Sequence, residues 1–330
     1  MSDSSRGRHR TDIGLLLPHF SDHATPQRLF GFARRIEELG FDSVWVRDAL
    51  SFEARGFEGA GRFVDPFVTL SVIAGLTTRL KLGTAVTIPF RHPLITAQMV
   101  GSLSWASGGR FELGVGPGTP RKPFELTGIP YDDRIVRCRE TVEVIRAVAQ
   151  GPHASYDGQC ASFHDASIDP APPPDLMVWY GGGSSASIRR ALRYCDGLQP
   201  GLCPRAAWVA IAAEARRRAA EASRSLQIGA IPLISLASTR EKAIERVASA
   251  IRPLCSFMSA YYRLPLETAD DLGGALIAGT ADDIIAGLMQ YVEAGADLVV
   301  LDARLLMEDF EDVIEEVGAR VLPAVRAASS

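Results

Sequence analysis

Short β-branched or apolar runs alternate with amphipathic stretches along almost the whole chain. This alternation is typical of repeated strand–helix units that build a parallel sheet. The predicted strands are residues 13–17, 43–46, 80–86, 111–115, 177–180, 197–199, 228–236 and 297–301. Eight such strands close most naturally into an α/β fold of the (β/α)8 TIM-barrel type, for which 330 residues are sufficient. A doubly wound open sheet gives similar local signals and stays as the alternative.

The segments between the strands predict helices and two insertions. Leu29, Phe32, Ile36 and Leu39 recur at helical spacing, and Gly40 follows where a C-cap glycine belongs. Two segments lack this spacing. Residues 151–175 are proline-rich and predict an inserted excursion with a small hairpin, and residues 263–279 predict an irregular segment that is a candidate lid. We therefore expect a barrel with insertions at its carboxyl-end loops.

The termini and composition limit the class of protein. Residues 1–11 are polar and basic without an apolar stretch, so they predict a disordered tail before one barrel domain at 12–330. A hydrophobic content of 47% suits a folded core, and a net charge of −4 without a basic stripe argues against nucleic acid as a partner. No apolar run is long enough to span a membrane. Five cysteines without a CxxC pair indicate a cytoplasmic protein with free thiols.

Three polar residues follow the first three predicted strands, where the active site of a barrel lies. These residues are His19, Asp48 and His92, and they are the candidate catalytic groups. Asp48 has a surface loop as its alternative placement, and His92 precedes Pro93, so it also suits the start of a helix. His19 and His23 are four residues apart, but the sequence has no HExxH pattern, so we expect no metal site.

Two glycine-rich elements follow later strands and indicate a cofactor. After the fifth strand come Tyr180, Gly181, Gly182, Gly183 and Ser184. Glycine backbone and a helix N-terminus favour an anion, so this element predicts a phosphate cradle, with a tight turn capped by Ser184 or Ser185 as the alternative. No lysine follows as a Walker loop requires, and no GxSxG elbow is present.

The second element follows the fourth strand and contains Gly116, Gly118 and Thr119. It resembles part of a dinucleotide fingerprint, but Thr119 stands where the last glycine is required and Pro117 interrupts the turn. We interpret it as a close backbone approach to a flat ligand.

Several strand-end motifs together resemble the bacterial luciferase-like flavin-dependent oxidoreductases. They are KLGTAV at 81–86, RHP at 91–93, SGGRFELGVG at 107–116 and WYGGGS at 179–184, with further similarity at 41–46, 194–197, 279–283 and 293–297. The resemblance implies a TIM barrel that binds FMN or the deazaflavin F420. It also implies a non-prolyl cis peptide at Ala85 and Val86 beneath the ring, and a homodimer. The phosphate would lie near Gly182, Gly183 and Ser184, while Gly116, Gly118 and Thr119 would flank the ring.

One position departs from this family. Many members carry a histidine after the acidic residue at the second strand end, whereas Asp48 is followed here by Ala49. Alanine transfers no proton, so His19 or His92 substitutes, or the reaction needs no base there, or activity is altered.

Three functions follow from the resemblance. The first is a monooxygenase that uses reduced FMN and O2 to oxygenate a small organic substrate, with a separate flavin reductase as a partner. The second is an F420-dependent hydride-transfer oxidoreductase, although a basic groove for the anionic F420 tail is not evident in the sequence. The third is a catalytically impaired flavin-binding protein. Phe20, Phe52 and Phe90 suggest an apolar pocket for the substrate, and core packing explains them almost as well.

Overall fold

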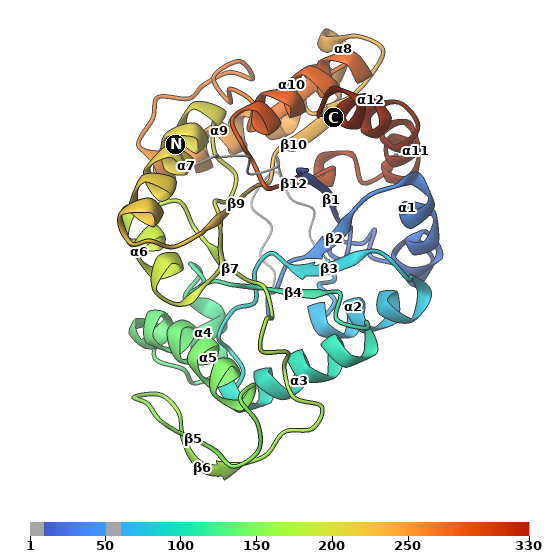
Figure 1. Cartoon of the computed structure of the whole chain (residues 1–330). Coiled ribbons are helices and arrows are strands. Elements are labelled where there is room, and N and C mark those ends of the chain that lie inside the picture. The colour runs from blue at the N-terminus through green and yellow to red at the C-terminus, as the bar shows by residue number, and fades with distance from the viewer. Residues whose placement is uncertain (1–9, 51–60, 330) are drawn as a thin grey trace, which may run out of the picture.

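Eight parallel strands close into a barrel with the helices arranged around it (Figure 1). The computed structural model describes residues 10–50 and 61–329, so residues 1–9 of the predicted tail and Phe52 lie outside the described residues. Around the barrel the strand order is β1-β12-β9-β8-β7-β4-β3-β2, and β1 closes the ring by pairing with both β12 and β2. The predicted TIM barrel is confirmed, and the open-sheet alternative is wrong. The barrel strands are β1 (Asp12–Leu16), β2 (Ser43–Val46), β3 (Lys81–Thr84), β4 (Phe111–Val115), β7 (Val178–Gly181), β8 (Gly197–Gln199), β9 (Gln227–Ala230) and β12 (Leu298–Leu301).

The helices lie where the helical spacing predicts them. Gly40 ends the first α-helix with a left-handed φ of 90°, as expected for a C-cap glycine. No helix in the described part of the chain is long and apolar enough to cross a membrane. The α-helices are α1 (Ala33–Leu39), α2 (Pro66–Leu76), α3 (Pro93–Ala106), α4 (Lys122–Leu126), α5 (Arg134–Val148), α6 (Ser185–Tyr194), α7 (Arg205–Glu221), α8 (Arg240–Arg246), α9 (Ala248–Tyr262), α10 (Ala281–Glu293), α11 (Phe310–Glu316) and α12 (Leu322–Ser329).

The first insertion is the predicted hairpin, formed by β5 (Ala154–Asp157) and β6 (Ser162–Ala166). It lies between α5 and β7, in a connection that leads into the amino end of a barrel strand, so the expectation of a carboxyl-end loop is wrong for this insertion. The buried carboxylate of Glu140 on α5 anchors its turn by accepting the backbone N–H groups of Gln159, Cys160 and Ala161 at 2.7, 2.8 and 3.0 Å. These bonds satisfy a charge that would otherwise be costly to bury.

The second insertion differs from its prediction. Residues 276–279 form a strand, β11 (Leu276–Gly279), which pairs in parallel with β10 (Leu233–Leu236), so the expectation of an irregular segment up to residue 279 is wrong at that end. Its run LIAG follows Gly273 and Gly274 and shows no alternation of apolar and polar residues, so no periodicity marks it as a strand. The predicted strand 228–236 is in turn two strands, because Pro232 has no N–H to donate to a ladder.

Two tryptophans fill the interior of the barrel. The rings of Trp45 and Trp179 meet edge to face, with their centroids 6.1 Å apart. They pack with Leu16, Leu298 and Val300, and we call these five side chains the indole layer. Gly83 and Gly197 leave room for the indoles, since a Cβ at either would lie 2.3 or 2.4 Å from a ring carbon. The barrel is therefore packed through its middle, and a ligand can bind only at an end.

Candidate active site

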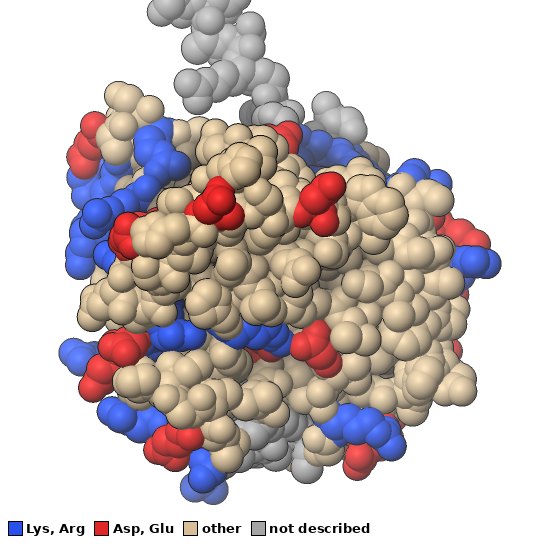
Figure 2. Space-filling view, turned by 90° about the horizontal axis from the view of Figure 1, so that it is seen from below, with Lys and Arg blue, Asp and Glu red and all other residues tan. Residues whose placement is uncertain are grey.

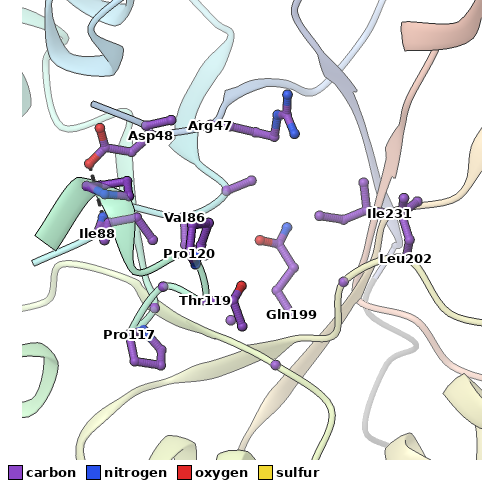
Figure 3. A pocket seen from close by; sticks show the side chains of 18 of the residues that line it. Arg47, Asp48, Val86, Ile88, Pro117, Thr119, Pro120, Gln199, Leu202 and Ile231 are labelled. Carbon is purple, nitrogen blue, oxygen red and sulfur yellow. Dashed lines mark hydrogen bonds between the residues drawn. The ribbon is translucent and has the colours of Figure 1, made fainter. Parts of the chain in front are cut away.

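A cavity of about 500 Å³ lies at the carboxyl ends of the strands (Figure 3). Its volume is within the range of roughly 300–1,000 Å³ that is usual for small-molecule sites. The loops after six barrel strands line it, together with the last turns of α9. The lining residues are Arg47, Asp48, Ala49, Phe63, Ala85, Val86, Ile88, Phe90, Gly116, Pro117, Gly118, Thr119, Pro120, Lys122, Pro123, Gly181, Gly182, Gln199, Gly201, Leu202, Ile231, Phe257, Tyr261 and Tyr262.

A non-prolyl cis peptide joins Ala85 to Val86 directly after β3, as the resemblance implies. Both residues line the cavity. The Val86 side chain lies against two glycine backbones, because a Cβ at Gly116 or Gly181 would come within 2.5 or 2.9 Å of its methyl groups. The strand ends thus form a flat apolar wall, which suits one face of an aromatic ring system.

A buried ion pair fixes the loop after this peptide bond. The carboxylate of Asp48, whose side chain is 2% exposed, accepts the Ile88 backbone N–H at 3.0 Å and a guanidinium N–H of Arg91 at 2.7 Å. Arg91 also pairs with Asp65 at 2.6 Å. Burial raises the pKa of Asp48, and the Arg91 guanidinium works against that shift. Asp48 therefore lines the cavity and also connects the loops after β2 and β3.

The structure brings most of the predicted site residues together. Asp48, Ala85, Val86, Gly116, Gly118, Thr119, Gly181 and Gly182 all line the cavity. Gly183 and Ser184 lie just beyond it: Ser184 caps α6 by accepting the Ser187 N–H at 3.1 Å, and the Gly182 N–H already donates to the Gln199 carbonyl at 3.1 Å. The phosphate cradle stays a prediction, and α6 begins directly after its last residue, Ser184.

Three predicted residues have other placements. His19 is fully buried, with Nδ1 3.0 Å from the Leu17 carbonyl and Nε2 accepting the Arg47 N–H at 3.0 Å. Burial lowers its pKa to about 3, so the ring is neutral at pH 7. His92 caps α3 by accepting the Leu94 N–H. Tyr180 packs against Tyr194 outside the barrel, because strand residues alternate and Trp179 points inward.

Several lining residues were not predicted. Gln199 ends β8, so the strand-end rule applied to that strand would have found it. Ile231 lies inside the predicted strand 228–236 and follows a strand end only because β9 stops at Ala230. Tyr261 and Tyr262 come from the end of α9 and have no such local signal, since only the fold brings that helix to the cavity. Within the described residues no group of three or more His, Cys, Asp or Glu side chains is arranged to hold a metal ion.

Comparison with known proteins identifies the family. A family model described as luciferase-like monooxygenase matches residues 11–298. The chain belongs to this family. An uncharacterized protein of Mycobacterium tuberculosis is 30% identical over 183 residues, and the chain spans 63% of its length, less than two thirds. An F420-dependent glucose-6-phosphate dehydrogenase of Amycolatopsis mediterranei is 26% identical over 332 residues, which cover 92% of this chain and 95% of the relative.

Several solved structures share the fold of this chain. An F420-dependent secondary alcohol dehydrogenase in complex with an F420-acetone adduct superposes with a TM-score of 0.78 at 21% identity, over 96% of this chain and 99% of that one. The oxygenating constituent of 3,6-diketocamphane monooxygenase from Pseudomonas putida, in complex with FMN, superposes with a TM-score of 0.75 at 18% identity. The superposition covers 95% of this chain and 98% of that one. At such identities these likenesses show the fold alone. The family assignment therefore rests on the family match, and the solved structures support the barrel fold.

Proposed function

We propose that this chain is an oxidoreductase that binds a flavin-type ring at the carboxyl end of its barrel and acts on a small organic substrate by F420-dependent hydride transfer. The observation that carries the proposal is the flat apolar wall that Ala85 and Val86 form in the cavity beside the glycine backbones of Gly116 and Gly181. A tricyclic ring needs such a flat apolar face, and the cavity volume of about 500 Å³ suits a ring with a small substrate.

The choice of F420 rests on the curated relatives. The glucose-6-phosphate dehydrogenase that matches 92% of the chain is named as F420-dependent. This ranking differs from the one that sequence alone gives, in which FMN leads. Oxygenation with reduced FMN, supplied by a separate reductase, is the second candidate function, and the fold neighbour solved with FMN favours it.

The residues of the chain would bind and orient the reactants and exclude water. Phe63, Ile88, Leu202 and Ile231 give the cavity apolar walls. When bound, reduced F420 supplies a hydride and reduced FMN supplies electrons to O2. Ala49 lines the cavity without a proton to transfer, and the neutral His19 ring has both nitrogens within hydrogen-bonding distance of backbone atoms. A reaction that needs no base at this position suits such a site best.

Anaerobic titration of the purified chain with reduced F420 and, separately, with reduced FMN tests the proposal. We expect F420 to bind and FMN to bind more weakly. FMN binding alone, followed by O2 consumption when air is admitted, would favour the second candidate function, oxygenation with reduced FMN. Binding without turnover, unchanged by Ala49→His, would indicate a flavin-binding protein with impaired catalysis. If neither cofactor binds, the proposal is wrong.

Filling the cavity at Gly201 should weaken cofactor binding without unfolding the protein. Gly201 lines the cavity, and a Cβ there would meet no atom within 4 Å, so the side chain of Gly201→Phe can be added at the cavity wall without a clash at its Cβ. We expect the cofactor dissociation constant to rise about tenfold or more. Gly31→Phe is the matched control, because Gly31 is exposed, has equal space and does not line the cavity. Equal affinities in the two variants would place the cofactor elsewhere.

We also propose that the chain forms a homodimer through α2 and α3. Neither helix contains a charged residue, and their outward positions include Val68, Val72, Ile95 and Trp105, with Trp105 76% exposed. Seen from the side where α3 lies, the surface has a broad area without charge (Figure 2). A second copy presents the same uncharged surface, so a two-fold contact would cover both.

The dimer is expected to dissociate when a charged residue is placed on the outward surface of α2 and α3. Trp105→Glu should give a monomer in size-exclusion chromatography with light scattering, because the contact would bury an unpaired carboxylate. Val209→Glu on α7 is the control, since it changes an exposed apolar residue outside the two helices and should leave the mass unchanged. A wild-type monomer would rule the dimer out.

A further inference from the structure

The carboxamide of Gln199 enters the cavity without a hydrogen-bond partner. The residue is 2% exposed, and neither Oε1 nor Nε2 has a partner among the described residues. Buried polar side chains are nearly always paired, so an unpaired one in a cavity wall requires an explanation, such as a bound molecule that supplies the partner. In Figure 3 the side chain projects into the space between Val86 and Ile231.

The surroundings of Gln199 hold this side chain in place. Its backbone pairs with Gly181 of β7, and its carbonyl accepts the Gly182 N–H at 3.1 Å. Its Cγ would lie 3.3 Å from a Cβ at Gly229, so the aliphatic part rests on that bare backbone. The backbone contacts fix where the carboxamide enters the cavity, and the group costs stability as long as it is unpaired.

The chemistry of a carboxamide restricts what can bind to it. A glutamine side chain offers an acceptor oxygen and a donor nitrogen in one plane. Its complement is a neutral planar group that carries a donor beside an acceptor, as the –CO–NH– edge of an amide, lactam or imide does. Leu202 and Ile231 are apolar neighbours in the same wall and offer no competing side-chain hydrogen bonds.

We propose that Gln199 recognises such a –CO–NH– edge on the bound ligand and is a specificity-determining residue. The inference rests on the proposed function, because that function places a ligand in this cavity. Two ligands can supply the edge: the pyrimidine ring of the flavin or deazaflavin, or an amide-type group of the organic substrate. Around the barrel β7 and β4 separate β8 from β3, so Gln199 faces the cis peptide from across the cavity and can reach either molecule.

Binding measurements with Gln199→Leu, which removes both hydrogen-bonding atoms, distinguish the two sources. The probes are F420, FMN, N3-methyl FMN and the small amides 2-pyrrolidinone and benzamide. If the cofactor supplies the edge, N3-methylation weakens binding of FMN to the wild type at least tenfold, and Gln199→Leu binds FMN and its methyl derivative with equal, reduced affinity. If the substrate supplies it, both flavins bind the wild type and the variant alike, and the variant loses at least tenfold in affinity for the amides.

The thermal midpoint gives a readout that requires no ligand. Because an unpaired buried amide is replaced by an apolar side chain, Gln199→Leu should unfold at the same temperature as the wild type or higher. A lower midpoint, or wild-type affinity of the variant for every probe, would overturn the inference. Failure of the wild type to bind any cofactor would instead contradict the proposed function, and the amide probes would still test Gln199.

Discussion

Replacing Asp48 with alanine is expected to lower the free energy of unfolding by about 3 kcal/mol, the lower end of what breaking a buried ion pair costs. The change leaves the Ile88 N–H and one side of the Arg91 guanidinium without the carboxylate that each now contacts. We choose the lower end because Arg91 is 21% exposed and keeps its second partner, Asp65. Urea denaturation followed by circular dichroism measures the change. Because Ile88 lines the cavity, cofactor affinity should fall as well.

Asp65→Asn is the matched control for this experiment. Asp65 is the other carboxylate on Arg91, but its side chain is 37% exposed. Asparagine keeps the capping bonds from the N–H groups of Phe67 and Val68 to Oδ1. It replaces the Oδ2 atom that accepts from Arg91 with an amide nitrogen, so the ion pair with Arg91 is lost. A loss of about 1 kcal/mol or less is expected for this more exposed pair. Equal losses in the two variants would contradict the role given to the buried carboxylate.

The free energy of unfolding should fall as the pH is lowered from 6.5 toward 3, because the His19 ring takes up a proton in the unfolded chain and stays neutral in the folded one. In the folded protein burial lowers its pKa to about 3, from the value of 6.5 that is usual for histidine. Below pH 6.5 the His19 imidazole is protonated in the unfolded chain but not in the folded one. The stabilisation present above pH 6.5 is therefore lost as the pH falls toward 3. The slope is about 1.4 kcal/mol per pH unit, or about 2 kcal/mol lost between pH 7 and pH 5.

His19→Asn removes this titration, and its side-chain amide can still donate to the Leu17 carbonyl. The variant should be less stable than the wild type at pH 7, but its stability should fall less steeply between pH 6.5 and pH 5. His92→Asn keeps the cap of α3 with a surface residue, and we expect it to retain the wild-type slope. Denaturant midpoints across this pH range provide the measurement. Parallel pH profiles for His19→Asn and the wild type would show that the ring is not the titrating group.

The barrel was predictable because its signals are local. Each strand is a short buried run, and features such as Gly40 or the cap at His92 mark where helices end and begin. The boundary at Pro232 is also local, but a continuous apolar pattern on both sides of it obscured the split between β9 and β10. Strand β11 depends on pairing with β10, which no property of its own four residues specifies.

The cavity was predictable only in part, for the same reason. Glycines and polar residues at strand ends indicate a site wherever the fold brings those ends together, and Asp48, Gly116 and Gly181 follow this rule. A strand-end position does not say which way a side chain points, and so His19 was selected although its ring is buried between backbone groups. Tyr261 and Tyr262 reach the cavity through the tertiary packing of α9, which no local pattern encodes.

The indole layer has a kinetic consequence for whatever binds above it. Because Trp45 and Trp179 fill the barrel, the cavity is closed on its amino-terminal side and molecules can exchange only on the side of the loops. When two reactants share such a blind-ended chamber, the one that lies deeper arrives first and leaves last. Turnover would then follow a compulsory order, and an excess of the outer reactant would trap the inner one and slow its release.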